Sequence, residues 1–195
     1  MKSLTCGWLV GFFVCSLASP LRAQDANPPD SKSSSVVKQL VAALDAAKLD
    51  CIAAKDPARP DTFVAALYFQ GSQLLVVSAK YSAPALLVDK LAKKDYRDVY
   101  LDLNGAAMPG TKVFVEDPGA NGLRPQRVEN QPFDSVEVEG KRTVFDGDWK
   151  KQNLSEEEYT KAFASADERY SQMLTALLAQ LKQTSDSAHA SGETD

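Results

Sequence analysis

The stretch that decides the fold runs from residue 62 to residue 80 and reads TFVAALYFQGSQLLVVSAK. It contains two runs rich in Val, Leu and aromatic residues, Thr62–Phe69 and Leu74–Ala79, and such runs are typical of β-strands. Gly71 and Ser72 lie between them, and glycine accepts the positive φ angle that a tight hairpin turn needs. The stretch therefore predicts a β-hairpin with a two-residue type II′ turn at Gly71-Ser72.

A helix and a short strand are expected before this hairpin. Apolar residues recur with helical spacing from Val37 to Ala47, after a run of serines that can cap a helix, so we expect an amphipathic helix over residues 35–48. Residues 49–54 predict a short strand. Two prolines in residues 56–60 indicate a turn, because proline blocks both helix and sheet ladder.

A helix and two further strands are expected after the hairpin. Ser82 is suited to cap a helix that runs to about Lys94, with Pro84 tolerated in its first turn. Residues 98–103 alternate between apolar and polar side chains, which is the pattern of a half-buried strand. Residues 112–116 predict another strand.

The remaining residues predict a hairpin and a long last helix. A loop rich in proline and glycine is expected over residues 117–135, and loops of this length are often functional. Residues 136–145 predict a second hairpin. Ser155 and Glu158 have the spacing of a capping box, and a helix is expected from there to about residue 182.

The first 23 residues predict an export signal. They have a positive start at Lys2, an apolar run at 8–14 and a small-residue cleavage site that ends at Ala23. We therefore expect a periplasmic or secreted protein whose mature chain begins at Gln24. The apolar run is shorter than the ~20 residues that a membrane span needs, so no stable membrane anchor is expected.

The mature chain is expected to be one acidic domain between two loose tails. Residues 24–34 predict a flexible tail, residues 35–183 a single domain, and residues 184–195 a disordered tail. Removing the signal also removes Lys2 and Arg22, which leaves 20 basic and 26 acidic residues and a formal charge of −6. This charge does not favour a nucleic-acid partner.

Histidine and cysteine usage excludes several kinds of chemistry. The one histidine, His189, falls in the expected C-terminal tail, which argues against a histidine-containing nucleophile triad and a histidine-ligated zinc site. Cys51 is the one cysteine that remains after the signal is removed, so it has no internal disulfide partner. We expect it to be a small core residue rather than a nucleophile.

Two groups of acidic residues are weaker candidates for chemistry. Asp146 and Asp148 are spaced to hold a hard cation beside Trp149, but two acids supply fewer oxygen ligands than a calcium loop needs. A tight turn with Trp149 packed near the last helix is the favoured interpretation. Glu137 and Glu139 would need burial to act as an acid–base pair.

The expected order of elements over residues 36–117 resembles the split β-barrel of the FMN-binding, pyridoxamine-phosphate-oxidase-like family. Members of that family often end the third strand with a hydroxyl residue, a basic residue and a serine that leads into a helix. The corresponding row here is SAKYSAP at residues 78–84. Ser78, Lys80 and Ser82 match the positions that hold the flavin phosphate in the family. The resemblance implies a homodimer and an FMN phosphate site at these three residues.

Taken together, the sequence predicts an exported α+β protein with a split β-barrel core, flanking helices and a long C-terminal helix. The favoured function is a non-catalytic binding or structural module of the cell envelope, with the identity of any small-molecule ligand left open. The alternative is an FMN-dependent oxidoreductase that uses Ser78, Lys80 and Ser82. Export favours the first function, because a protein exported unfolded must acquire its flavin where free flavin is scarce.

Overall fold

The computed structural model describes residues 31–80, 112–127 and 130–191, which form an α+β fold with a six-stranded antiparallel sheet and a long C-terminal helix. The strands are β1 (Cys51–Lys55), β2 (Thr62–Phe69), β3 (Gln73–Lys80), β4 (Val113–Pro118), β5 (Asp134–Val138) and β6 (Lys141–Phe145). The helices are α1 (Lys32–Ala47), the short 3₁₀ helix η1 (Trp149–Gln152) and α4 (Glu156–Ser191).

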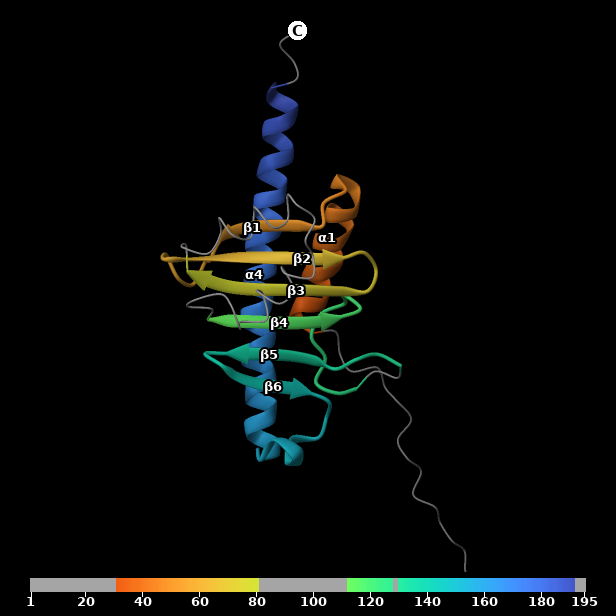
Figure 1. Cartoon of the computed structure of the whole chain (residues 1–195), viewed down its shortest axis with the longest axis vertical. Coiled ribbons are helices and arrows are strands. Elements are labelled where there is room, and N and C mark those ends of the chain that lie inside the picture. The colour runs from red at the N-terminus through yellow and green to blue at the C-terminus, as the bar shows by residue number, and fades with distance from the viewer. Residues whose placement is uncertain (1–30, 81–111, 128–129, 192–195) are drawn as a thin grey trace, which may run out of the picture.

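The sheet is a simple meander with the strand order β1-β2-β3-β4-β5-β6. Both long helices lie on the same face of it, and α4 crosses behind the strands from the β6 edge to the β1 edge (Figure 1). In the part of the chain that the structure describes, β6 does not pair with β1, so the sheet is open. The α+β prediction is confirmed, and the split-barrel core stays a prediction.

Both faces of the sheet are apolar at β2 and β3. On the helix face, Val64 and Val76 pack with Leu44 of α1 and Leu174 of α4 in one buried cluster. The other face buries a second cluster that includes Phe63, Leu67, Leu75, Val77 and Phe114. Burial on both faces explains why β2 and β3 read as continuous apolar runs rather than as alternating patterns.

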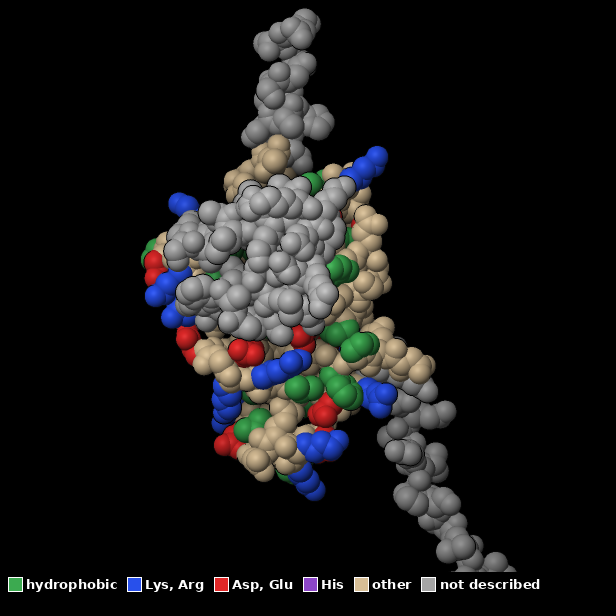
Figure 2. All heavy atoms as spheres, in the orientation of Figure 1, with side chains coloured by type: hydrophobic (Ala, Val, Ile, Leu, Met, Phe, Trp, Pro, Cys, Tyr) green, Lys and Arg blue, Asp and Glu red, His purple; other side chains and the backbone are tan. Residues whose placement is uncertain are grey.

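Charged side chains lie beside this second cluster on the sheet face opposite the helices. At the β5–β6 end of that face, Figure 2 shows acidic and basic side chains intermixed. Arg142 of β6 forms an ion pair there with Glu116 of β4. Because positive and negative side chains are intermixed, this end of the face carries no extended electrostatic potential of one sign.

The β2–β3 hairpin is confirmed, but the predicted turn type is wrong. Phe69 pairs with Gln73, so three residues form the loop, and the Ser72 N–H donates to the Phe69 carbonyl over 2.9 Å. Gly71, with φ of +71°, is the third residue of this turn. A type II′ turn needs the positive φ at the second residue, whereas here it is at the third. A two-residue loop at Gly71-Ser72 would also pair Gln73 with Gln70, but in the structure Gln73 pairs with Phe69.

The second predicted hairpin, β5–β6, is also confirmed. Val138 pairs with Lys141, and the two residues between them, Glu139 and Gly140, have φ of +50° and +82°. Two consecutive positive φ angles are the mark of a type I′ turn, whose twist matches the twist of the flanking strands.

The start of α1 differs from the prediction, while the start of α4 confirms it. Helix α1 begins at Lys32 because Asp167 of α4 accepts hydrogen bonds from the backbone N–H groups of Lys32 (2.8 Å) and Ser33 (3.1 Å). Another helix thus supplies the cap. At α4 the capping box is present: Glu158 accepts from the Ser155 N–H over 2.7 Å, and the Glu158 N–H donates to the Ser155 hydroxyl over 3.2 Å.

Apart from the end of α4, the remaining element predictions agree with the structure where it describes the chain. Strands β1 and β4 lie where residues 49–54 and 112–116 predict strands, within about two residues at each end. The predicted helix from Ser82 and the predicted strand 98–103 lie outside the described residues. Helix α4 continues to Ser191, beyond the end expected at about residue 182. No helix in the described ranges has the length and apolarity to span a membrane.

Candidate functional site

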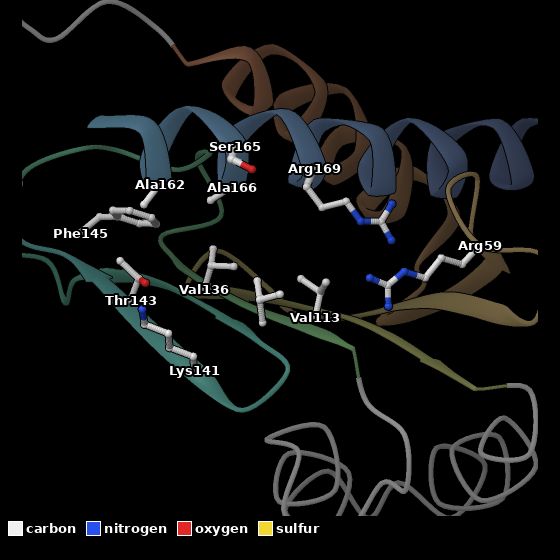
Figure 3. Close-up of a pocket in the computed structure, with 11 residues that line it drawn as sticks. Arg59, Val113, Val136, Lys141, Thr143, Phe145, Ala162, Ser165, Ala166 and Arg169 are labelled. Atoms are coloured by element: carbon white, nitrogen blue, oxygen red, sulfur yellow. The ribbon is translucent and has the colours of Figure 1, made fainter. Parts of the chain in front are cut away.

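A cavity of about 460 Å³ lies between α4 and the β4–β6 part of the sheet (Figure 3). This volume is in the range of pockets that bind small molecules, which is about 300–1,000 Å³. Its walls are mainly apolar. The apolar lining consists of Val113, Val136, Val138, Phe145, Ala162 and Ala166.

The cavity exists because α4 carries small side chains at this point. Ala162 and Ala166 are four residues apart and so lie on one face of the helix, opposite the valines of β4 and β5. Further along the same face, Met173 and Leu177 fill the space between the helix and the sheet and are fully buried. The change from alanine to large side chains along the helix closes the cavity at that end.

The cavity is apolar at one end and cationic at the other. Figure 3 shows Phe145 and Ala162 at the apolar end, and the guanidinium groups of Arg59 and Arg169 near one another at the opposite end. Lys141 of β6 also lines the cavity, and Figure 3 shows it near Thr143, away from the two arginines. Among the lining residues that the structure describes, three are basic and none is acidic.

Arg169 is held in place by a buried carboxylate. Its Nη2 donates to Asp56, whose side chain is fully buried, and Asp56 also accepts from the hydroxyl of Ser78 on β3. The backbone N–H of Ala58 donates to the other oxygen of Asp56 over 2.9 Å. Burial of Asp56 acts to raise its pKa, but the hydrogen bonds from Arg169, Ser78 and Ala58 outweigh burial and the pKa is lowered. Asp56 is therefore ionised at neutral pH and fixes the guanidinium.

The two arginines have unequal partners. The Nη1 atom of Arg169 is buried and has no hydrogen-bond partner in the described structure. Arg59 Nη1 lies 3.3 Å from Glu139, a half-exposed side chain that Lys112 also approaches, at 3.8 Å. An exposed and shared ion pair of this kind holds an arginine only weakly. Both guanidinium groups can thus donate to a further anionic partner.

The residues that match the flavin-phosphate positions are placed as follows. Ser78 is buried on β3 and donates to Asp56, and Lys80 is exposed at the end of the same strand. Ser82 lies outside the described residues. A phosphate at the Ser78 hydroxyl would meet the carboxylate of Asp56, and the two anions would repel each other. The FMN site at Ser78, Lys80 and Ser82 stays a prediction.

A second polar cluster has a structural role. Asp117 of β4 accepts hydrogen bonds from the hydroxyl of Tyr170 (3.0 Å) and from the N–H groups of Asn121 (3.1 Å) and Gly122 (2.9 Å). Burial raises the pKa of Asp117 to about 6, although these bonds oppose the shift. Because both backbone donors belong to the segment that follows β4, the cluster holds that segment against α4.

The other candidates from the sequence have structural partners. Burial raises the pKa of the Cys51 thiol to about 12, so it stays protonated at neutral pH and is a poor nucleophile. Asp146 accepts from the Asp148 N–H over 2.8 Å, and Trp149 packs against the core, as the tight-turn interpretation requires. No group of three His, Cys, Asp or Glu side chains in the described ranges could hold a metal ion.

Sequence reasoning missed Arg59 and Arg169 as site residues. A signal for Arg169 is present: Ala162, Ala166, Arg169 and Met173 share one helical face, which places a charge beside small residues on the side of α4 that packs on the sheet. Arg59 has no such signal, because it lies in a turn and its role depends on the position of α4.

Comparison with protein-family models, with curated proteins and with solved structures gives no match to this chain. The function is therefore argued from the cavity itself.

Proposed function

We propose that the protein is a non-catalytic binding module of the cell envelope that holds a small, mainly apolar molecule in the cavity between α4 and β4–β6. The observation that carries the proposal is the cavity of about 460 Å³ with valine, alanine and phenylalanine walls. Apolar walls with a few polar groups at one end are typical of small-molecule sites. The expected export signal supports the location in the envelope.

The lining chemistry favours binding over catalysis. Thr143 and Ser165 carry the hydroxyl groups of the lining, and the lining residues that the structure describes include no histidine, cysteine or carboxylate. A serine or threonine nucleophile needs a neighbouring base to remove its proton. The carboxylates described in contact with a lining residue are already engaged: Asp56 by Arg169 and Ser78, and Glu139 by Arg59 and Lys112.

The split-barrel core, the homodimer and the FMN-dependent alternative stay predictions that rest on the family resemblance. Of these, the FMN alternative needs Ser78 free to contact a phosphate. In the structure its hydroxyl donates to Asp56. For this reason the apolar cavity supports the binding module better.

Filling the cavity tests the proposal. We expect mature protein to raise the fluorescence of the neutral apolar dye N-phenyl-1-naphthylamine, and Ala166→Trp to weaken this binding by about tenfold or more, because the indole would occupy the space beside Val136. Ala164→Trp is the matched control, since Ala164 is exposed on the same helix.

Circular dichroism and a melting curve establish that both tryptophan variants fold. Should Ala166→Trp unfold the protein, the smaller Ala166→Leu substitution is used instead, with an intermediate loss of dye binding expected. Equal dye binding by the wild type and a folded Ala166 variant would refute the proposal. A wild-type protein that does not raise the fluorescence of the dye would refute it too.

A further inference from the structure

Among the residues that the structure describes, basic side chains outnumber acidic ones at the arginine end of the cavity. Arg59 and Arg169 line this end, and Lys112 contacts Glu139, the partner of Arg59. The acidic partners described there are Asp56, which engages Arg169, and Glu139, which Arg59 and Lys112 share. Among the described residues, three basic groups therefore face two acidic groups at this end, an excess of one positive charge. An anion would be attracted to this end of the cavity, and a cation would be repelled.

The guanidinium of Arg169 is preorganised for such an anion. Asp56 and Ser78 both lie within hydrogen-bond reach of Nη2, at 3.4 Å in the case of the Ser78 hydroxyl, so the group cannot turn away from its position. Its Nη1 remains without an acceptor. A fixed donor costs a ligand little ordering entropy, and charge-assisted bonds from arginine to an oxyanion are among the stronger hydrogen bonds in proteins.

The donors and the charge at this end favour a carboxylate as the anionic head. The Nη1 of Arg169 and the guanidinium of Arg59, which a half-exposed glutamate engages only weakly, are the donors at this end. A carboxylate presents two oxygens to them, and its single negative charge balances the local excess of one positive charge. The valine, alanine and phenylalanine walls continue from this end and exclude water from whatever is attached to the head.

From these observations we infer that the cavity selects a carboxylate with a single apolar chain, with the head between Arg59 and Arg169 and the chain directed towards Phe145. The inference rests on the proposed binding function and adds the chemical class of the ligand. Lys141, which lines the same cavity, adds to the attraction without a fixed contact.

Three ligands with the same eight-carbon chain test the inference: octanoate, 1-octanol and octylamine. Each competes with N-phenyl-1-naphthylamine for the mature wild-type protein. We expect octanoate to bind about tenfold or more tightly than 1-octanol, and octylamine more weakly than either. The preference for octanoate should shrink as salt is added, because Arg59 is partly exposed to solvent.

A charge-removing variant locates the head group. Arg59→Gln should reduce octanoate affinity about tenfold and leave 1-octanol affinity unchanged. The matched control is Arg127→Gln, because Arg127 contacts the ring of Phe133 and does not line the cavity. Arg169 is not substituted in this test, since its loss would leave Asp56 buried without its partner.

The outcomes separate the two proposals. Octanoate and 1-octanol binding with equal affinity, or an octanoate preference that survives Arg59→Gln, would overturn the carboxylate inference and leave the apolar binding function standing. A wild-type protein that binds neither the dye nor any of the three ligands would overturn both.

Discussion

Asp134 provides a test of how burial controls the stability of this protein. It lies at the start of β5 with a side chain that is almost fully buried, and it accepts a hydrogen bond from the Arg124 N–H over 2.7 Å. Burial raises its pKa to about 8, and the charge of the nearby Asp117 adds to the shift. An unfolded chain returns the residue to the ordinary value of 3.8.

The sign and size of the effect follow from these two values. Because the folded pKa lies above the unfolded one, the contribution of Asp134 to stability is complete below about pH 4 and is lost as the pH rises towards 8. Between these limits the folded state holds one proton more than the unfolded state. The free energy of unfolding then falls by about 1.4 kcal/mol per pH unit, or about 3 kcal/mol between pH 5 and pH 7.

Asp134→Asn should remove this dependence. The asparagine carbonyl can still accept from the Arg124 N–H, but the side chain no longer titrates. We expect the slope between pH 5 and pH 7 to flatten by about 1.4 kcal/mol per pH unit, which leaves the smaller contribution from Asp117, whose pKa burial raises to about 6.

Urea unfolding of the mature protein at pH 5, 6, 7 and 8, followed by circular dichroism, measures these slopes. Asp61→Asn is the control, because Asp61 is exposed and its substitution should leave the slope as in the wild type. A wild-type stability that stays flat or increases from pH 5 to pH 7 would show the reasoning to be wrong. The same conclusion would follow from equal slopes in the wild type and Asp134→Asn.

Two other substitutions probe long-range contacts. Arg169→Met should lower the free energy of unfolding by about 3–5 kcal/mol, because it leaves the Asp56 carboxylate buried without its partner. Adding Asp56→Asn should recover part of this loss. A loss below about 1 kcal/mol for Arg169→Met in urea unfolding would contradict the pairing. Gly122→Ala should lower the melting temperature markedly more than Gly140→Ala. Both glycines have positive φ, so both substitutions strain the backbone. A Cβ at Gly122 would also lie 2.5 Å from the Cα of Ser34, whereas a Cβ at Gly140 would meet open space. Equal losses in the two alanine variants would mean that the contact with Ser34 is not tight.

Local chemistry decided much of the secondary structure in advance. The β2–β3 hairpin follows from two apolar runs around one glycine, and the start of α4 follows from Ser155 and Glu158, whose hydrogen bonds span three residues. Such features are predictable because the interacting groups are neighbours in the chain. The turn at Gly71 shows the limit, since its type depended on which residues of the two strands pair.

The site could not be predicted in the same way. The sequence drew attention to Ser78, Lys80 and Ser82 because they lie close together in the chain, whereas the cavity is lined from the turn before β2, from three strands and from α4. Small residues on α4 are visible in the sequence. That they lie opposite valines of β4 and β5, and so leave a cavity, is a property of the packed structure.

The sequence by itself determined the α+β class, the two hairpins and the capped C-terminal helix, because each depends on contacts within a few residues. Only the tertiary structure decided which polar groups meet. Arg169 reaches Asp56 across 113 residues, and Asp167 caps α1 at Lys32 across 135 residues. A buried charge must find a partner somewhere in the fold, but which partner it finds depends on how the helices pack on the sheet.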